Sequence, residues 1–118
     1  MNLSFLRIRD KGDIANERLV FRASANTDIG EYVLIKAFYT DDTPYSGEPE
    51  FSFWFMDKPI KKNDLVVIYS KVGSHSSKLL ENERTSHFFY LDQEHTLWDE
   101  DNYRPVLLEV ARWKVCEV

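Results

Sequence analysis

Three histidines are the residues of this chain best suited to chemistry: His75, His87 and His95. Histidine changes charge near neutral pH and binds metals, so it suits acid–base catalysis and metal coordination. The intervals between the three match no standard zinc pattern. If His87 begins a strand and His95 lies in the next loop, the two rings could meet near Asp92 and Glu94. This would form a metal-binding or hydrolytic site, whereas the simpler interpretation is three solvated loop histidines.

Acidic side chains are dense between residues 92 and 101. Oxygen-rich loops of this kind bind Ca²⁺ in some proteins. The spacing here lacks the turn glycine and the closing glutamate of an EF-hand loop. The pattern therefore favours an exposed acidic loop, because runs of charge are usually solvated. A bound metal ion is the alternative to a solvated loop.

Serines are frequent between residues 70 and 86, and Ser74 stands beside His75. A serine nucleophile needs a base within hydrogen-bond reach and a third group that orients the base. The chain has no Gly-x-Ser-x-Gly motif and only four glycines, which leaves no glycine-rich loop to hold a phosphate. The sequence therefore predicts no cofactor and favours a protein that is not an enzyme.

Aromatic residues make up 14% of the chain and lie mostly in short apolar runs. They form either a core or a stacking platform for bases or sugars. Trp54 is the exception to a core assignment. If Phe53 and Phe55 point inward, Trp54 and Met56 point outward on the same strand and mark a contact surface. Trp98, in the acidic stretch, is a second aromatic candidate for binding.

The charge balance restricts the class of partner. The chain carries 20 acidic and 15 basic residues, for a net charge of −5. This argues against broad nucleic-acid binding, which needs a basic face, and favours a basic or neutral partner. It does not exclude a local basic patch. Lys58, Lys61 and Lys62 keep nucleic-acid binding as a third alternative.

The sequence predicts no association with a membrane. Its first ten residues lack the apolar region and cleavage site of a signal peptide. No apolar stretch approaches the roughly 20 residues that span a bilayer. The one cysteine, Cys116, excludes an internal disulfide and fits a reducing compartment. We therefore expect a cytoplasmic protein.

The elements that position these residues are expected to be strands. Turn clusters separate runs of β-branched and aromatic residues, and no good helical pattern occurs. A loop is expected at residues 40–50 and a longer one at 70–86. The pattern predicts one domain, residues 1–118, folded as an all-β, immunoglobulin-like sandwich of about seven strands. Its unpaired edges would allow a homodimer. The expected strands cover residues 3–9, 18–24, 31–39, 51–56, 65–69, 87–91 and 106–115.

Four stretches occur in an order that resembles the lamin-tail domain: residues 30–35 (GEYVLI), 59–69 (PIKKNDLVVIY), Leu97-Trp98 and residues 106–108 (VLL). This family has an immunoglobulin-like β-sandwich. The resemblance covers roughly residues 30–110, although Asn63 stands at the family's turn glycine and Ala37 at its usual asparagine. It implies a non-catalytic interaction role. No binding residue carries over, because the matching positions belong to the core.

These observations predict a small binding or structural module that acts through protein–protein contacts, with an unknown partner. The binding candidates are Trp54, His75, His87, His95 and Trp98. If a site for a small ligand exists, we expect it between residues 70 and 102, where the histidines, the acids and the longest loop occur together.

Overall fold

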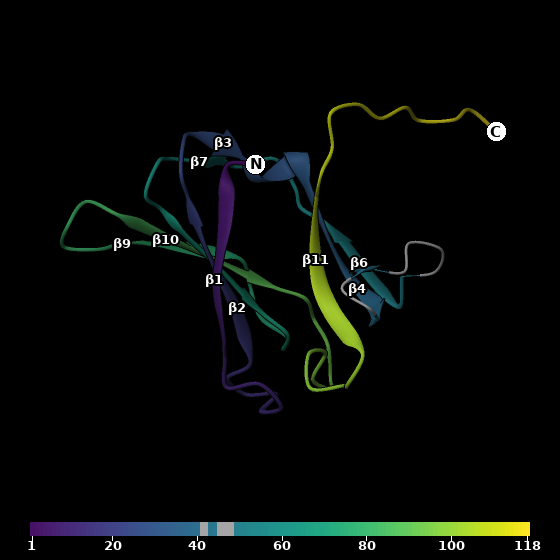
Figure 1. Ribbon diagram of the computed structural model, residues 1–118. Helices are drawn as coiled ribbons and strands as arrows, with labels where there is room; N and C mark the ends of the chain where they lie inside the picture. The colour runs from purple at the N-terminus through teal and green to yellow at the C-terminus, as the bar shows by residue number, and fades with distance from the viewer. Residues whose placement is uncertain (41–42, 45–48) are drawn as a thin grey trace.

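The chain folds into two β-sheets that face each other, in a computed structural model that describes residues 1–40, 43–44 and 49–118 (Figure 1). The larger sheet has the strand order β1 (Leu3–Arg9), β2 (Arg18–Ala23), β8 (Leu65–Tyr69), β10 (Thr85–Tyr90), β9 (Ser76–Leu79). In the smaller sheet, β4 (Tyr32–Thr40) pairs with β11 (Tyr103–Glu109), β6 (Phe51–Trp54) and β5 (Thr43–Pro44). A short ladder of β3 (Thr27–Asp28) and β7 (Pro59–Ile60) lies near one end of the sandwich, and one 3₁₀ turn (Ile29–Glu31) follows β3.

The predicted all-β sandwich is confirmed, with more strands than the expected seven. Eleven strands form within the described part of the chain. The additional strands are β3, β5 and β7, each two residues long, and β9. The sequence of β9, SSKL, is mostly polar, and all four of its residues are exposed. Such strands carry no apolar alternation that a sequence pattern could reveal. No helix among the described residues is long and apolar enough to cross a membrane.

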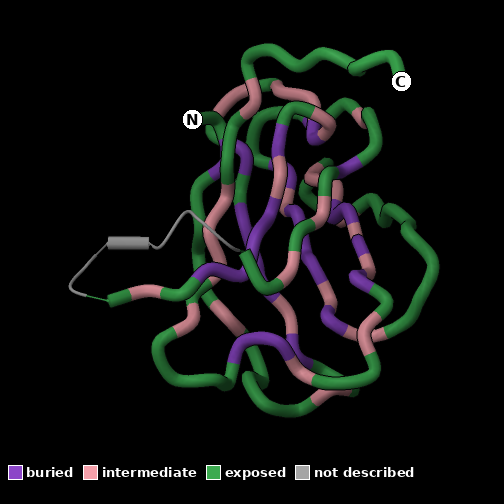
Figure 2. The backbone as a smooth tube through the Cα atoms, turned by 90° about the vertical axis from the view of Figure 1, so that its right-hand side faces the viewer, coloured by how far each residue is buried: buried purple, intermediate pink, exposed green. Residues whose placement is uncertain are grey.

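The core lies between the inner faces of the two sheets, where Figure 2 shows the buried segments. β4 is the middle strand of the smaller sheet, and Tyr32 and Leu34 are completely buried on its inner side. Leu19 of β2 and Val66 of β8 reach the same core from the larger sheet. The apolar faces predicted for residues 31–39 thus place β4 at the centre of its sheet.

Several expected element boundaries differ from the structure. The expected loop at residues 70–86 contains β9, which forms a hairpin with β10. The last strand was expected to reach residue 115 but ends at Glu109, and residues 111–118 form an exposed tail that leaves the sandwich (Figure 1). Alternation alone predicted that tail as strand, yet it has no neighbouring strand among the described residues. The expected loop at 40–50 lies mostly outside the described residues.

A buried carboxyl group closes the end of the sandwich near the β1–β2 turn. Glu17 is 0% exposed. Its Oε1 accepts the backbone N–H of Gly12 at 3.0 Å, and its Oε2 accepts the backbone N–H of Leu97 at 2.9 Å and the hydroxyl of Ser70. One side chain therefore joins three loops that are distant in sequence.

Candidate functional site

An apolar groove opens between the two sheets on the side where β1 and β11 lie. Its volume is about 480 Å³. This falls within the roughly 300–1,000 Å³ of typical ligand sites. Of the described residues that line it, Arg104 alone has a charged side chain. Its apolar lining includes Leu3, Phe5, Ile8, Phe21 and Leu107.

Both borders of the groove are free strand edges. β1 is the end strand of the larger sheet and β11 is the end strand of the smaller one, within the residues that the structure describes. An end strand presents backbone N–H and C=O groups that no neighbouring strand satisfies. The groove therefore combines an apolar floor with two rows of backbone hydrogen-bonding groups.

A β-bulge places the apolar residues of β1 in this groove. Phe5 pairs with Phe21 and Ile8 pairs with Leu19, and the register shifts between them because Leu6 has no partner. Under strict alternation, Ile8 would point away from Phe5. The extra residue reverses the side on which the following residues point, so Leu3, Phe5 and Ile8 all face inward.

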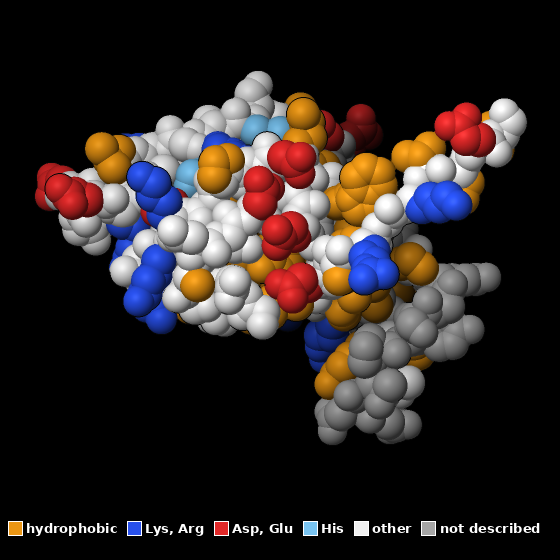
Figure 3. Space-filling view, turned by 90° about the horizontal axis from the view of Figure 1, so that it is seen from above, with side chains coloured by type: hydrophobic (Ala, Val, Ile, Leu, Met, Phe, Trp, Pro, Cys, Tyr) orange, Lys and Arg blue, Asp and Glu red, His pale blue; other side chains and the backbone are white. Residues whose placement is uncertain are grey.

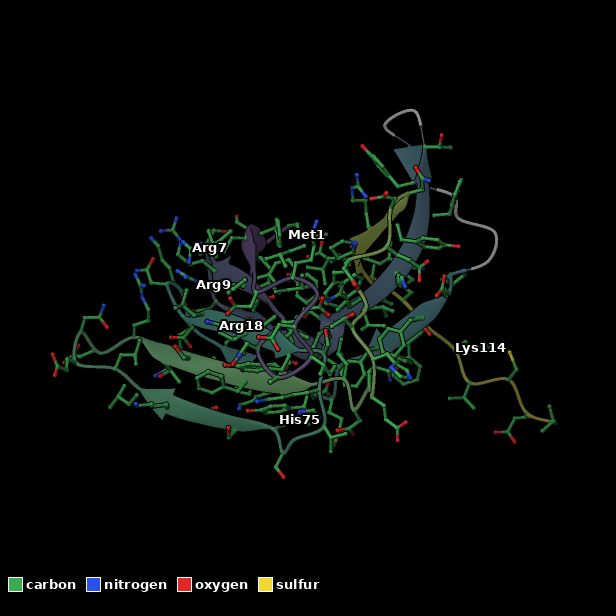
Figure 4. All side chains as sticks on the ribbon, turned by 90° about the horizontal axis from the view of Figure 1, so that it is seen from below. Met1, Arg7, Arg9, Arg18, His75 and Lys114 are labelled. Carbon is green, nitrogen blue, oxygen red and sulfur yellow. The ribbon has the colours of Figure 1, made fainter. Side chains whose placement is uncertain are left out.

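The border formed by β1 is positively charged. The bulge that turns Ile8 inward turns Arg7 and Arg9 outward, opposite Val20 and Arg18 of β2. Figure 4 shows Arg7, Arg9 and Arg18 together on this side of the molecule, with Met1 beside the space between the sheets. Arg18 pairs with Asp10 at 3.0 Å, whereas Arg7 and Arg9 form no ion pair with any described residue. A local basic surface thus exists on a chain whose net charge is −5.

His87, one of the predicted site residues, lies on the inner side of the larger sheet and is 6% exposed. Its Nε2 lies 2.8 Å from Asp64 Oδ2, and its Nδ1 lies 3.0 Å from Ser77 Oγ. Burial acts to raise the pKa of Asp64. The hydrogen bonds from His87 and from the backbone N–H groups of Lys61 and Thr85 outweigh burial, so this pKa lies below its usual value.

The structure gives the other two histidines different surroundings. His75 is exposed, and its Nδ1 accepts the backbone N–H of Tyr90 at 3.1 Å. His95 is exposed in the loop after β10. In His87, Nε2 contacts Asp64 and Nδ1 contacts Ser77. Neither ring nitrogen of His87 therefore contacts His95. Among the described residues, no group of three or more His, Cys, Asp or Glu side chains is arranged to hold a metal ion.

The two tryptophan candidates lie in opposite environments. Trp54 is 48% exposed and Met56 is 80% exposed, as the outward alternation predicted. The Trp54 indole N–H donates to the carbonyl of Gly30 at 2.8 Å. The Trp54 ring packs edge-on against the ring of Trp113 in the tail, with the two ring centroids 5.5 Å apart. Trp98 is 3% exposed and belongs to the core, so it offers no surface to a partner.

An acidic depression lies beside the tryptophan pair. Its volume is about 480 Å³, and Glu31, Asp57, Glu109 and Trp113 line it. Viewed from above, carboxylate side chains gather next to large hydrophobic ones (Figure 3). The charge of this surface is opposite to that of the β1 border.

Sequence reasoning did not find the groove, Asp64 or Ser77. The interval between Phe5 and Ile8 was the available signal for the groove, because two apolar residues three positions apart can share a strand face only across a bulge. Asp64 follows Asn63, whose φ of 76° marks a tight turn. Ser77 had no signal, because its pairing with His87 depends on the register of a polar strand.

No protein-family model and no curated protein sequence matches this chain.

Proposed function

We propose that this protein is a binding module that holds an extended segment of a partner protein in the groove between β1 and β11. The groove itself carries the proposal, because it joins an apolar floor to two free strand edges. An extended peptide satisfies both features at once. Its backbone pairs with a free edge, and every second side chain enters the apolar floor.

The shape of the groove defines the apolar half of the segment. Phe5 is 50% exposed at the β1 border, and Leu107 of β11 lines the other side. A large apolar side chain of the partner placed between them would cover Phe5. Burial of apolar surface contributes roughly 25 cal/mol per Å², so this position would supply much of the affinity.

The charges around the groove define the polar half of the segment. Arg104 lines the groove, and Arg7 and Arg9 stand on the adjacent border. The outward side chains of the segment would therefore be acidic. Charge complementarity of this kind raises the association rate and selects among partners, and added salt weakens it.

The resemblance to the lamin-tail domain supports the same class of function, because it implies an immunoglobulin-like sandwich that acts through contacts. A cytoplasmic location also belongs to this proposal, since Cys116 is a free, exposed thiol. A thiol of this kind persists in a reducing compartment. A second copy of the chain is another source of a pairing strand, so the oligomeric state is measured in the same experiment.

The test is selection from a random peptide library displayed on phage, with the immobilised full chain as the target. We expect enriched peptides in which apolar residues alternate with Asp or Glu. Synthetic copies of these peptides, labelled with a fluorophore, then give the dissociation constant by anisotropy. Replacement of Phe5 by Glu should weaken binding at least about tenfold, since loss of one buried anchor costs about 1.4 kcal/mol or more.

Leu79→Glu is the matched control, because Leu79 is also exposed but lies on β9 at the opposite edge of the larger sheet. It should leave binding unchanged. Enriched peptides that bind the Phe5→Glu protein as tightly as the unaltered protein would refute the groove. Failure to enrich any peptide would refute peptide binding itself. A concentration-dependent dimer that Phe5→Glu abolishes would identify a second copy as the occupant.

A further inference from the structure

Four polar side chains form a connected row at the β9 edge of the larger sheet, opposite the groove; Lys58 reaches this row from the segment before β7. The Lys58 ammonium donates to Ser77 Oγ, which lies 3.0 Å from His87 Nδ1. His87 Nε2 in turn lies 2.8 Å from Asp64 Oδ2. This row includes a nucleophile, a base and a carboxylate in contact, and the proposed peptide groove uses none of them.

The strand register explains why the row forms. Ser77 and His87 are direct partners across the antiparallel pair of β9 and β10. His87 is also the partner of Val66 across the parallel pair of β10 and β8. Asp64 precedes Val66 by two positions, so its side chain points to the same side of the sheet. The residue before β8, together with β10 and β9, therefore places Asp64, His87 and Ser77 side by side on one face of the sheet.

The carboxylate determines the hydrogen-bonding state of the base. Asp64 is 4% exposed, and the backbone N–H groups of Lys61 and Thr85 fix its two oxygens at 2.9 Å and 3.1 Å. An ionised carboxylate only accepts hydrogen bonds, so the neutral ring of His87 carries its proton on Nε2. The lone pair of Nδ1 then faces the Ser77 hydroxyl, which donates to it.

The row has the order of a serine-hydrolase triad, with the two ring nitrogens exchanged relative to the chymotrypsin arrangement. Ser77 lies exposed on an edge strand, whereas His87 and Asp64 are buried beneath it. A small acyl donor can therefore reach Oγ from solvent while the base stays shielded. The Lys58 ammonium beside Oγ supplies positive charge where the carbonyl oxygen of an attacked ester becomes negative.

We propose that Ser77 is an activated nucleophile that takes the acyl group from a small ester, with His87 as its general base. Ser77 Oγ bonds to the carbonyl carbon of the ester, and its proton passes to His87 Nδ1. The bond from that carbon to the alcohol oxygen breaks, and the alcohol leaves with the proton from His87. Water then attacks the acyl-serine by the same route, which releases the acid and restores Ser77. Asp64 is a positioning residue that stabilises the protonated ring.

The experiment uses the full chain and p-nitrophenyl acetate as the acyl donor. Release of p-nitrophenol gives the rate, and peptide mapping by mass spectrometry locates the acetyl group. Treatment with hydroxylamine distinguishes acetylated serine from acetylated lysine, because it removes acetyl from a serine ester but not from a lysine amide. We expect an ester on Ser77, formed at least about 100-fold faster than on an ordinary exposed serine, the contribution typical of general base catalysis.

Ser76→Ala is the matched control, because Ser76 precedes Ser77 on β9 and points to the other side of the sheet. It should leave the rate unchanged, while Ser77→Ala and His87→Gln should each abolish the fast ester. Circular dichroism reports whether the variants keep their fold, and the map of the unaltered protein decides the site independently of them. Acetyl on lysines alone, an equal rate in Ser77→Ala, or an equal rate for the protein unfolded in urea would each overturn the proposal.

Discussion

Asp64 Oδ1 accepts the backbone N–H of Thr85 at 3.1 Å, at the point where β8 and β10 begin to run in parallel. The same carboxylate also accepts from the backbone of Lys61 and from the ring of His87. One side chain thus fixes a turn and the start of a strand pair. Its protonation should therefore affect the stability of the whole larger sheet.

Acid should destabilise the fold through Asp64. Its pKa in the folded protein lies below the usual value, whereas the unfolded chain regains about 3.9. Between these two pKa values the unfolded state binds more protons, so stability is complete above about pH 4 and falls as the pH drops through the folded-state pKa. Urea unfolding at pH 7 and pH 3 measures this loss. Asp64→Asn should be less stable at pH 7 and should lose less on acidification.

Asp101→Asn is the control for that experiment, because Asp101 is exposed and forms no hydrogen bond with the described residues. It should follow the unaltered protein at both pH values. An equal acid-induced loss in the Asp64→Asn protein would assign the effect to other carboxyl groups.

Removal of the Glu17 side chain should destabilise the end of the sandwich. Glu17→Ala leaves the N–H groups of Gly12 and Leu97 and the Ser70 hydroxyl without their acceptor. A buried polar group without a partner costs about 1–3 kcal/mol. We expect the free energy of unfolding to fall by about 3 kcal/mol or more, as measured by urea denaturation. Glu17→Gln keeps one carbonyl oxygen and should lose less, and a loss below about 1 kcal/mol for Glu17→Ala would contradict a structural role.

Deletion of Leu6 should keep the fold and increase self-association. Leu6 is the unpaired residue of the β1 bulge, and without it Leu3, Phe5 and Ile8 alternate regularly on the inner face. A regular edge strand pairs with another copy of the chain more readily than a bulged one. The shortened protein should therefore sediment as a dimer at concentrations where the unaltered protein does not. A misfolded or strictly monomeric product would show that the bulge has another role.

The contact between Trp54 and Trp113 should hold the tail against the smaller sheet. Their rings meet edge-on at 5.5 Å, while residues 111–118 are otherwise exposed. Trp54→Ala should therefore speed tryptic cleavage after Arg112 and Lys114. Limited proteolysis followed by mass spectrometry measures these rates. Met56→Ala is the control, because Met56 is exposed beside Trp54 and has no ring, and equal cleavage in both variants would exclude the contact.

The fold could be predicted where apolar residues alternate. The strand at residues 31–39 has apolar side chains on both faces, and β4 is the middle strand of its sheet. The outward direction of Trp54 followed from the same alternation. Prediction failed at β9 and in the tail for complementary reasons. β9 is polar and becomes a strand only because β10 offers a partner, whereas the tail alternates but has no partner among the described residues.

The candidate sites were less predictable, because they depend on pairing across the sheet. His87 was recognisable as a chemically capable residue. Its partners Asp64 and Ser77 lie 23 and 10 residues away in sequence and meet it through two different strand pairings. Register of this kind is set by packing of the whole sheet and not by local pattern. The groove depended on one unpaired residue, Leu6, in the same way.

The pairing of β4 with β11 has a consequence for biosynthesis. β4 is complete at Thr40, yet the register joins Tyr32 to Glu109, and the Tyr32 hydroxyl donates to the Glu109 carboxylate 77 residues later. On the ribosome, β4 must therefore wait with one edge unpaired until almost seventy further residues have emerged. Translation at about 5–20 residues per second makes that wait several seconds. During this interval the nascent chain exposes an apolar strand edge, which is the feature that ribosome-associated chaperones would need to shield.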